Sequence, residues 1–176
     1  MLSFRSSRGF TLIEAMVTIA LLGFLLLVGL PAFTTMLANL RVRAVSDGVL
    51  SGIQFARAEA LKRNQNMTFR LDPLTGVGGG WQVLLPDGTM IQSKSAAEGG
   101  AVQVALATAD TEIVFDNLGQ RLLPAAPARL NVDVSNPGVG NCEPVGSVRC
   151  LRITVSIGGE ARLCDPRRAA GDPQAC

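Results

Sequence analysis

Gly9-Phe10-Thr11-Leu12-Ile13-Glu14 opens an apolar run that extends to Leu30 and contains one charged side chain, that of Glu14. The 21 residues from Phe10 to Leu30 would form a helix about 31 Å long, close to the hydrocarbon thickness of a bilayer. A cleavable secretory signal has a shorter apolar region, about 7–15 residues, and a small-residue cleavage site after it. Here the small-residue junction precedes the apolar run. We therefore expect residues 10–30 to remain in the protein as a membrane-spanning helix.

The apolar pattern continues beyond Pro31 in a thinner form that is typical of a helix with one buried face. Apolar residues recur mostly three or four positions apart, and charged residues lie between them. The members of this stripe are Phe33, Leu37, Leu40, Ala44, Val45, Val49, Ile53, Ala56 and Ala60. We expect residues 31–64 to continue the same helix, with a bend near Pro31, where a backbone hydrogen bond is lost. The rest of the chain must then cover the stripe.

From Met67 onward the period changes to two, and Gly, Pro, Asn and Asp punctuate the chain. This pattern predicts strands at 67–71, 81–85, 89–92, 101–107, 112–116, 130–134, 150–157 and 160–164. Tight-turn sequences such as Pro86-Asp87-Gly88 and Gly158-Gly159 separate them and favour antiparallel hairpins. The sequence therefore predicts an α+β fold. In it, the outer half of the long helix packs on an antiparallel sheet of two hairpin-rich layers, formed by residues 65–176.

Four cysteines, Cys142, Cys150, Cys164 and Cys176, lie in the last quarter of the chain without a C-x-x-C pair that would indicate a zinc or redox site. We interpret them as two disulfides, which need an oxidising compartment. The C-terminal domain would then be periplasmic or extracellular and the N-terminus cytoplasmic. Of three possible connectivities we expect nearest neighbours to pair, Cys142 with Cys150 and Cys164 with Cys176. Free buried thiols are the alternative.

Charge and residue inventory argue against an enzyme. The 16 basic and 14 acidic residues give a net charge of +2, which becomes zero if residues 1–9 are removed with Arg5 and Arg8, so overall charge indicates no particular partner. The chain has no histidine and no G-x-S-x-G motif. Val77-Gly78-Gly79-Gly80 precedes a strand and lacks the helix and lysine of a phosphate-binding loop, so we interpret it as a hairpin loop. We expect no catalytic residue, no cofactor and no metal site.

Several groups of residues resemble type IV pilin-like proteins, and among these the GspH/FimT-type minor pilins and pseudopilins. Residues 9–14, followed by the span, are similar to the class III leader junction of these proteins. Further matches are Ala56-Arg57-Ala58-Glu59-Ala60 with Arg63-Asn64, Gly80-Trp81-Gln82-Val83 with Asp87-Gly88, Ile113-x-Phe115-x-x-x-Gly119, and Ala161-Arg162-Leu163-Cys164-Asp165-Pro166. Together they cover nearly the whole chain.

The resemblance implies that a prepilin peptidase of the inner membrane removes residues 1–9 by cutting between Gly9 and Phe10. The same enzyme would methylate the new amino group of Phe10. Gly9 lets an extended chain pass close to a protease, and Arg5 and Arg8 would hold the leader on the cytoplasmic face. The alternative is an ordinary signal anchor that is never cut.

Glu14 needs an explanation, because a carboxylate at the centre of a membrane helix costs about 2.5–3.5 kcal/mol on insertion scales. The resemblance implies that it pairs with the N-terminal amine of a neighbouring subunit and so guides assembly of a filament. A local explanation stands beside this one. Thr11-Leu12-Ile13-Glu14 fits a capping box, and an acid in the first turn is favoured by the helix dipole.

Some members of the family bind DNA through a Gly-Arg-x-Arg motif on the last hairpin. The matching residues here are Gly159-Glu160-Ala161-Arg162, so an acid replaces one arginine. Arg162, Arg167 and Arg168 remain as possible contacts to a phosphate backbone. A solvated surface without a ligand is the alternative interpretation.

The sequence thus predicts a minor pilin or pseudopilin that primes assembly of a type IV pilus or sits near its tip. A type II secretion pseudopilin and a DNA-binding competence-pilus subunit are the alternatives. The expected partners are other major and minor pilins, the prepilin peptidase, and the inner membrane with its assembly platform, with DNA as a further possibility. We expect a single-pass inner-membrane protein before assembly and a filament or cell-surface protein after it.

Overall fold

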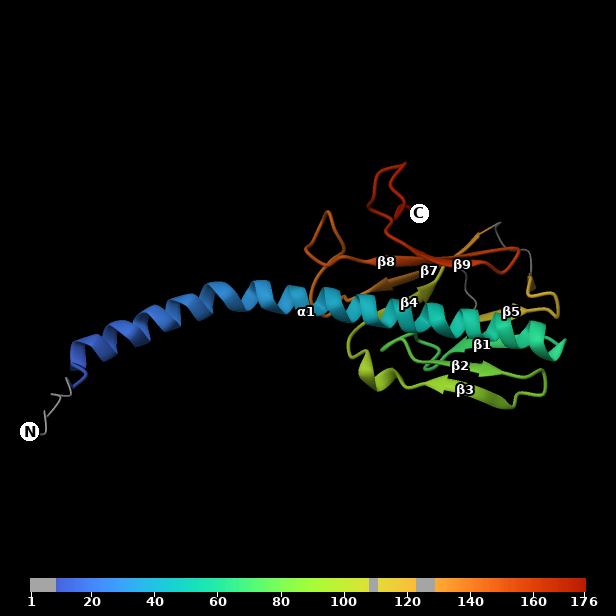
Figure 1. Ribbon diagram of the computed structural model, residues 1–176, viewed down its shortest axis with the longest axis horizontal. Helices are drawn as coiled ribbons and strands as arrows, with labels where there is room; N and C mark the ends of the chain where they lie inside the picture. Colours follow the sequence, from blue (N-terminus) through green and yellow to red (C-terminus); the bar gives the residue numbers. More distant parts are fainter. Residues whose placement is uncertain (1–8, 108–110, 123–128) are drawn as a thin grey trace, which may run out of the picture.

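The computed structural model describes residues 9–107, 111–122 and 129–176, apart from the side chains of Val28 and Pro31. Arg5 and Arg8 of the expected leader lie outside the described residues. One long helix, α1 (Leu12–Arg63), carries a β-rich domain on its C-terminal half, while its N-terminal half extends away from the domain (Figure 1). The fold is α+β, as the sequence predicted.

The helix α1 is 52 residues long, and its two ends follow from local chemistry. The Thr11 side chain is the N-cap and accepts a hydrogen bond from the backbone N–H of Glu14 at 3.3 Å. At the other end Asn64 takes the left-handed conformation with φ of 53°, and Lys62 and Arg63 stand in the last turn, where positive charge is favourable. The helix therefore begins at Leu12 and not at Phe10, because Thr11 caps it.

The first sheet has five antiparallel strands in the order β3-β2-β1-β5-β6. They are β1 (Met67–Leu71), β2 (Trp81–Leu84), β3 (Met90–Lys94), β5 (Glu112–Phe115) and β6 (Arg121–Leu122). In β1 the apolar side chains Met67, Phe69 and Leu71 are buried and the residues between them are partly exposed. This alternation is the period of two that the sequence shows.

The second sheet has four antiparallel strands in the order β4-β7-β8-β9. They are β4 (Gln103–Leu106), β7 (Arg129–Ser135), β8 (Leu151–Ser156) and β9 (Ala161–Cys164). Strand β9 is the outermost strand of this sheet on the side of α1. It therefore leaves one edge of the sheet beside the helix.

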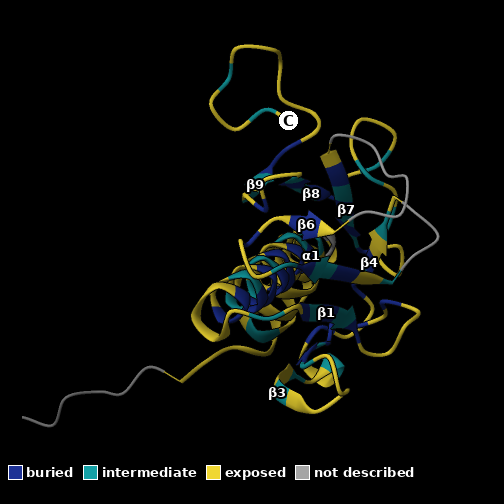
Figure 2. Ribbon diagram, turned by 90° about the vertical axis from the view of Figure 1, so that its right-hand side faces the viewer, coloured by how far each residue is buried: buried dark blue, intermediate teal, exposed yellow. Residues whose placement is uncertain are grey.

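The C-terminal half of α1 packs against both sheets (Figures 1 and 2). Its fully or nearly fully buried apolar side chains recur every three or four residues and so form one face: Val42, Val45, Val49, Ile53, Ala56 and Ala60. Gly52 lies on the same side of the helix, and a Cβ there would stand 2.6 Å from Cε2 of Trp81. The absence of a side chain at Gly52 thus lets the Trp81 ring lie against the helix backbone.

Several details differ from the sequence predictions. The sequence did not predict strand β6 or the short 3₁₀ helix η1 (Ala96–Glu98), because segments of two or three residues are too short to display a period. The strand expected from residue 101 begins at Gln103, after a turn that contains Gly99 and Gly100. By contrast, the helix continues through residue 31 as predicted, and its N-terminal half is bowed (Figure 1).

Candidate assembly surface

The N-terminal half of α1 is a long apolar surface that this chain does not cover. Among the side chains that the structure describes from residue 12 to residue 37, none is buried. Large apolar side chains stand on all sides: Leu12, Ile13, Met16, Val17, Ile19, Leu21, Leu22, Phe24, Leu25, Leu26, Leu27, Leu30, Phe33, Met36 and Leu37. By length and composition this helix could cross a membrane. We call residues 12–37 the exposed half of α1.

Glu14 is the one acidic residue of this exposed half and lies in its first turn. Its backbone N–H is held by Thr11, whereas its carboxylate has no hydrogen-bond or ion-pair partner within the described part of the chain. The neighbouring side chains Ile13 and Val17 are apolar and exposed. A carboxylate in such a surface is stabilised when a positive group pairs with it.

The expected cleavage junction precedes the helix. Gly9 and Phe10 have no regular secondary structure and are exposed, and no atom lies within 4 Å of the position that a Cβ of Gly9 would take. The chain is thus exposed and outside the helix where the sequence predicts a protease to act.

Both disulfides lie in the C-terminal part of the domain. Cys142 pairs with Cys150 and Cys164 with Cys176, with Cα–Cα distances of 5.4 and 5.1 Å, and this is the nearest-neighbour pairing expected from the sequence. The loops that they close are drawn in orange and red in Figure 1, at the end of the second sheet near the point where α1 leaves the domain. The red loop, residues 165–176, is the C-terminal tail.

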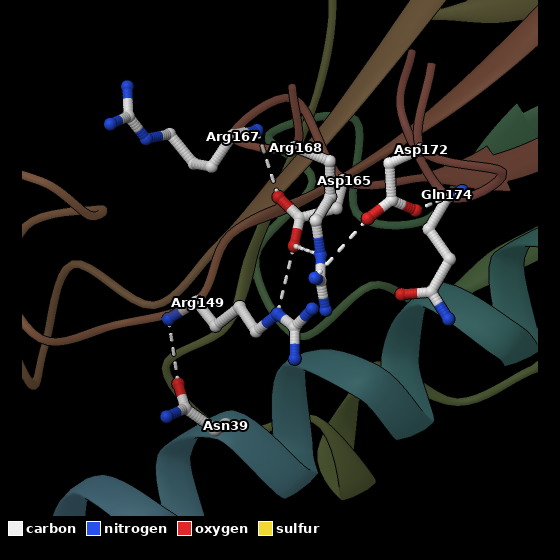
Figure 3. Close-up of polar contacts among 7 residues, drawn as sticks. All are labelled: Asn39, Arg149, Asp165, Arg167, Arg168, Asp172 and Gln174. Carbon is white, nitrogen blue, oxygen red and sulfur yellow. Dashed lines mark hydrogen bonds and ion pairs between the residues drawn. The ribbon is translucent and has the colours of Figure 1, made fainter. Parts of the chain in front are cut away.

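Asp165 fastens the start of this tail (Figure 3). Its carboxylate is 5% exposed and accepts hydrogen bonds from Nε of Arg149 and from the backbone N–H of Arg167, both at 2.9 Å. Nε of Arg168 lies 3.8 Å away. Burial raises the pKa of Asp165, but these hydrogen bonds and the two guanidinium charges outweigh burial, so the pKa lies below its usual value.

The same network reaches α1 through Arg149. The backbone N–H of Arg149 donates to Oδ1 of Asn39 at 2.8 Å. This bond joins two residues that are 110 positions apart, so the sequence alone does not predict it. Asn39 therefore marks the point on the helix where the domain begins to cover it.

The structure brings the three arginines considered for DNA binding to the end of β9 and the tail, but two of them have protein partners. Nη2 of Arg162 donates to the Ala175 carbonyl at 2.6 Å, and Nη1 of Arg168 lies 3.3 Å from Asp172. The Arg167 side chain points away from the cluster (Figure 3). The charge of Arg168 is therefore partly neutralised by carboxylates, whereas Arg162 uses one donor on a neutral carbonyl.

A groove of about 740 Å³ lies between α1 and the second sheet. Met36 and Leu40 of α1 line one wall, and Leu151 and Leu163 line the other. Its walls come from segments more than 100 residues apart, so a local sequence pattern does not reveal it. We call it the α1–β9 groove.

Half of α1 is exposed and half is packed, a single acid lies near its exposed end, and the domain has two sheets. Together these features define a pilin-like filament subunit. The family described as "Type II transport protein GspH" matches residues 46–159, more than half of the chain, and the "Prokaryotic N-terminal methylation motif" matches residues 4–30. The chain belongs to the GspH family. Among curated protein sequences no match was found.

Solved structures of similar fold are minor pilins and pseudopilins. The type IV minor pilin FimU of Pseudomonas aeruginosa is 15% identical, with a TM-score of 0.58 over 77% of this chain and 94% of FimU. The minor pseudopilin EpsH of the type 2 secretion system of Vibrio cholerae is 14% identical, with a TM-score of 0.51 over 73% of this chain and 99% of EpsH. At these identities the likeness shows a shared fold.

Proposed function

We propose that this protein is a minor subunit of a type IV pilus that primes assembly or sits near the tip. The observation that carries the proposal is the exposed half of α1, whose apolar side chains need lipid before assembly and other pilin helices after it. The same segment then serves both states. Before assembly the protein is a single-pass inner-membrane protein with a cytoplasmic N-terminus and a periplasmic domain.

Cleavage between Gly9 and Phe10 by a prepilin peptidase, with methylation of Phe10, is the second part of the proposal. Its support is the match of residues 4–30 to the methylation motif and the exposed, non-helical chain at Gly9 and Phe10. The mature protein should begin with N-methylphenylalanine, as intact mass and N-terminal sequencing of protein from the native host would reveal. Protein that keeps Met1 and the leader would contradict this processing.

Glu14 is the proposed assembly residue. The freed amine of Phe10 on one subunit would pair with the Glu14 carboxylate of another and offset the cost of an acid in an apolar surface. Glu14→Ala should insert into the membrane normally but be depleted in sheared filaments, as quantitative immunoblotting of both fractions would measure. Glu98→Ala, at an exposed acid of the domain, is the matched control. Normal incorporation of Glu14→Ala would refute the role.

A pseudopilus of type II secretion is the second candidate, favoured by the description of the matched family and by the likeness to EpsH. The two candidates predict different losses after deletion of the gene. A pilus subunit should affect surface filaments, and a pseudopilin should affect the release of secreted enzymes with filaments unchanged. The assembly platform in the inner membrane would be the partner in either system.

DNA binding is the weakest of the three candidates. The feature in its favour is Arg167, which extends from the tail away from its neighbours (Figure 3). Full-length protein in detergent should then retard duplex DNA at low salt, and Arg167→Gln should weaken the retardation. No retardation at low salt would remove this candidate.

A further inference from the structure

The α1–β9 groove lies beside the edge of the second sheet. Strand β9 is the outermost strand, and the tail pairs only with its end, where the Asp165 N–H donates to the Gln174 carbonyl at 2.7 Å. The side chain of Leu163 lines the groove before this point. An extended partner surface can therefore lie between the helix and β9.

The groove is continuous with the exposed half of α1. Phe33, Met36 and Leu40 stand three and four residues apart on one face of the helix and are 56%, 60% and 56% exposed. Met36 and Leu40 also line the groove. A helix that packs along this stripe would, without changing direction, enter the groove.

One of the residues that line the groove, Arg149, is positively charged and can still donate hydrogen bonds. Arg149 uses Nε for Asp165, and within the described residues no acceptor pairs with its two terminal nitrogens, which extend over α1 in Figure 3. Asp165 is shared between Arg149, the Arg167 N–H and Nε of Arg168, and Arg168 pairs with Asp172 as well. A guanidinium in this state binds a carboxylate with two parallel hydrogen bonds.

We propose that the α1–β9 groove receives the helix of a neighbouring pilin-like subunit, which inserts an apolar side chain between Leu40 and Leu163 and places a carboxylate on Arg149. A groove that combines apolar side chains with the guanidinium of Arg149 fits an amphipathic helix that carries an acid beside its apolar face. The inference rests on the proposed function, because a filament is what brings a second subunit alongside α1.

Photo-cross-linking in the native host tests the occupant directly. The full chain carries p-benzoylphenylalanine in place of Met36, and a second form carries it in place of Leu61, which is 50% exposed on the same helix but far from the groove. After irradiation of filaments, the Met36 probe should yield a peptide from the N-terminal helix of a pilin subunit, with Asp or Glu within one turn. The Leu61 probe should not. Cross-links from Met36 that map only to lipid or to a β-domain would overturn the proposal.

A matched pair of variants separates this inference from the proposed function. Leu40→Glu puts an acid into the groove and should lower the amount in sheared filaments about tenfold, equivalent to about 1.4 kcal/mol. Leu61→Glu should stay close to the wild-type amount, and both variants should keep the wild-type thermal midpoint, since both positions are exposed. Wild-type abundance of Leu40→Glu would refute the groove alone. Absence of the wild-type protein from filaments would refute the proposed function itself.

Discussion

The two halves of α1 share one continuous backbone but are built for different surroundings. In the C-terminal half the apolar residues keep to one face, and Ile53 is 0% exposed beneath the sheets. In the exposed half they stand all round the helix, and Ile19 is 70% exposed. A domain can cover one face of a helix, whereas a helix that is apolar all round needs lipid or several other helices. The contrast therefore separates the segment that stabilises the domain from the segment that the domain leaves uncovered.

The largest expected effect contrasts the two isoleucines. Ile53→Ala leaves a cavity in a packed core and should lower the free energy of unfolding of the domain by about 2–5 kcal/mol. Ile19→Ala should change it by less than about 0.5 kcal/mol, since Ile19 has no contacts with the domain core. Denaturant unfolding of the detergent-solubilised chain, followed by the fluorescence of Trp81, would measure both. Equal losses at the two positions would break the contrast.

Removal of the tail disulfide tests how much it stabilises the domain near Asn39, where the covered half of α1 begins. Replacing Cys164 and Cys176 together by Ser should lower the free energy of unfolding by about 3 kcal/mol, because the unfolded chain gains loop entropy. The pair Cys142 and Cys150 closes a shorter loop and should cost slightly less. Chemical denaturation of both double variants would compare them. An unchanged midpoint without the tail disulfide would mean that it does not support the domain.

Asp165 makes the stability of the domain depend on pH. Because its pKa is lowered in the folded chain, folding favours the ionised form, and the stability that it contributes is complete above its unfolded pKa of about 3.9. That stability is lost as the pH falls from there through the folded value. Asp165→Asn should therefore cost about 1–3 kcal/mol at pH 7. The difference from wild type should shrink below about pH 4, and a difference independent of pH would contradict the role of ionisation.

The smallest expected effect concerns Asn39, where coverage of the helix begins. Asn39→Ala removes the acceptor for the Arg149 N–H and should cost about 0.5–1.5 kcal/mol. Gln54→Ala, at an exposed position of the packed half, should be neutral. Hydrogen exchange at Arg149 should rise in the Asn39 variant. Unaltered exchange would show that packing alone holds the domain against α1 near Asn39.

The helix and most strands could be predicted because they follow from local periods. Apolar residues three or four apart marked the buried stripe from Val45 to Ala60, and alternation marked the strands from Met67 onward. The predicted stripe was wrong at its N-terminal end, where Phe33, Leu37, Leu40 and Ala44 are exposed and Val42 is buried instead, because the domain covers the helix only from about residue 38. The two-residue strand β6 carries no such pattern and depends on its pairing with β5. The junction at Gly9, Phe10 and Glu14 is a contiguous motif, so the sequence could indicate it.

The sequence by itself determined that this chain has a membrane-length helix with a lone acid near its start, an amphipathic continuation, a β-rich domain and a place in the GspH family. These features depend on residues that are close together in the sequence, so the period and composition of each segment predict them. Only the tertiary structure decided how the strands divide between the two sheets that α1 packs against, and that Asn39 meets Arg149, 110 residues away, beside Asp165. It also decided that a groove opens beside β9. Such contacts arise from the packing of segments that are distant in the sequence, so the local pattern of residues does not predict them.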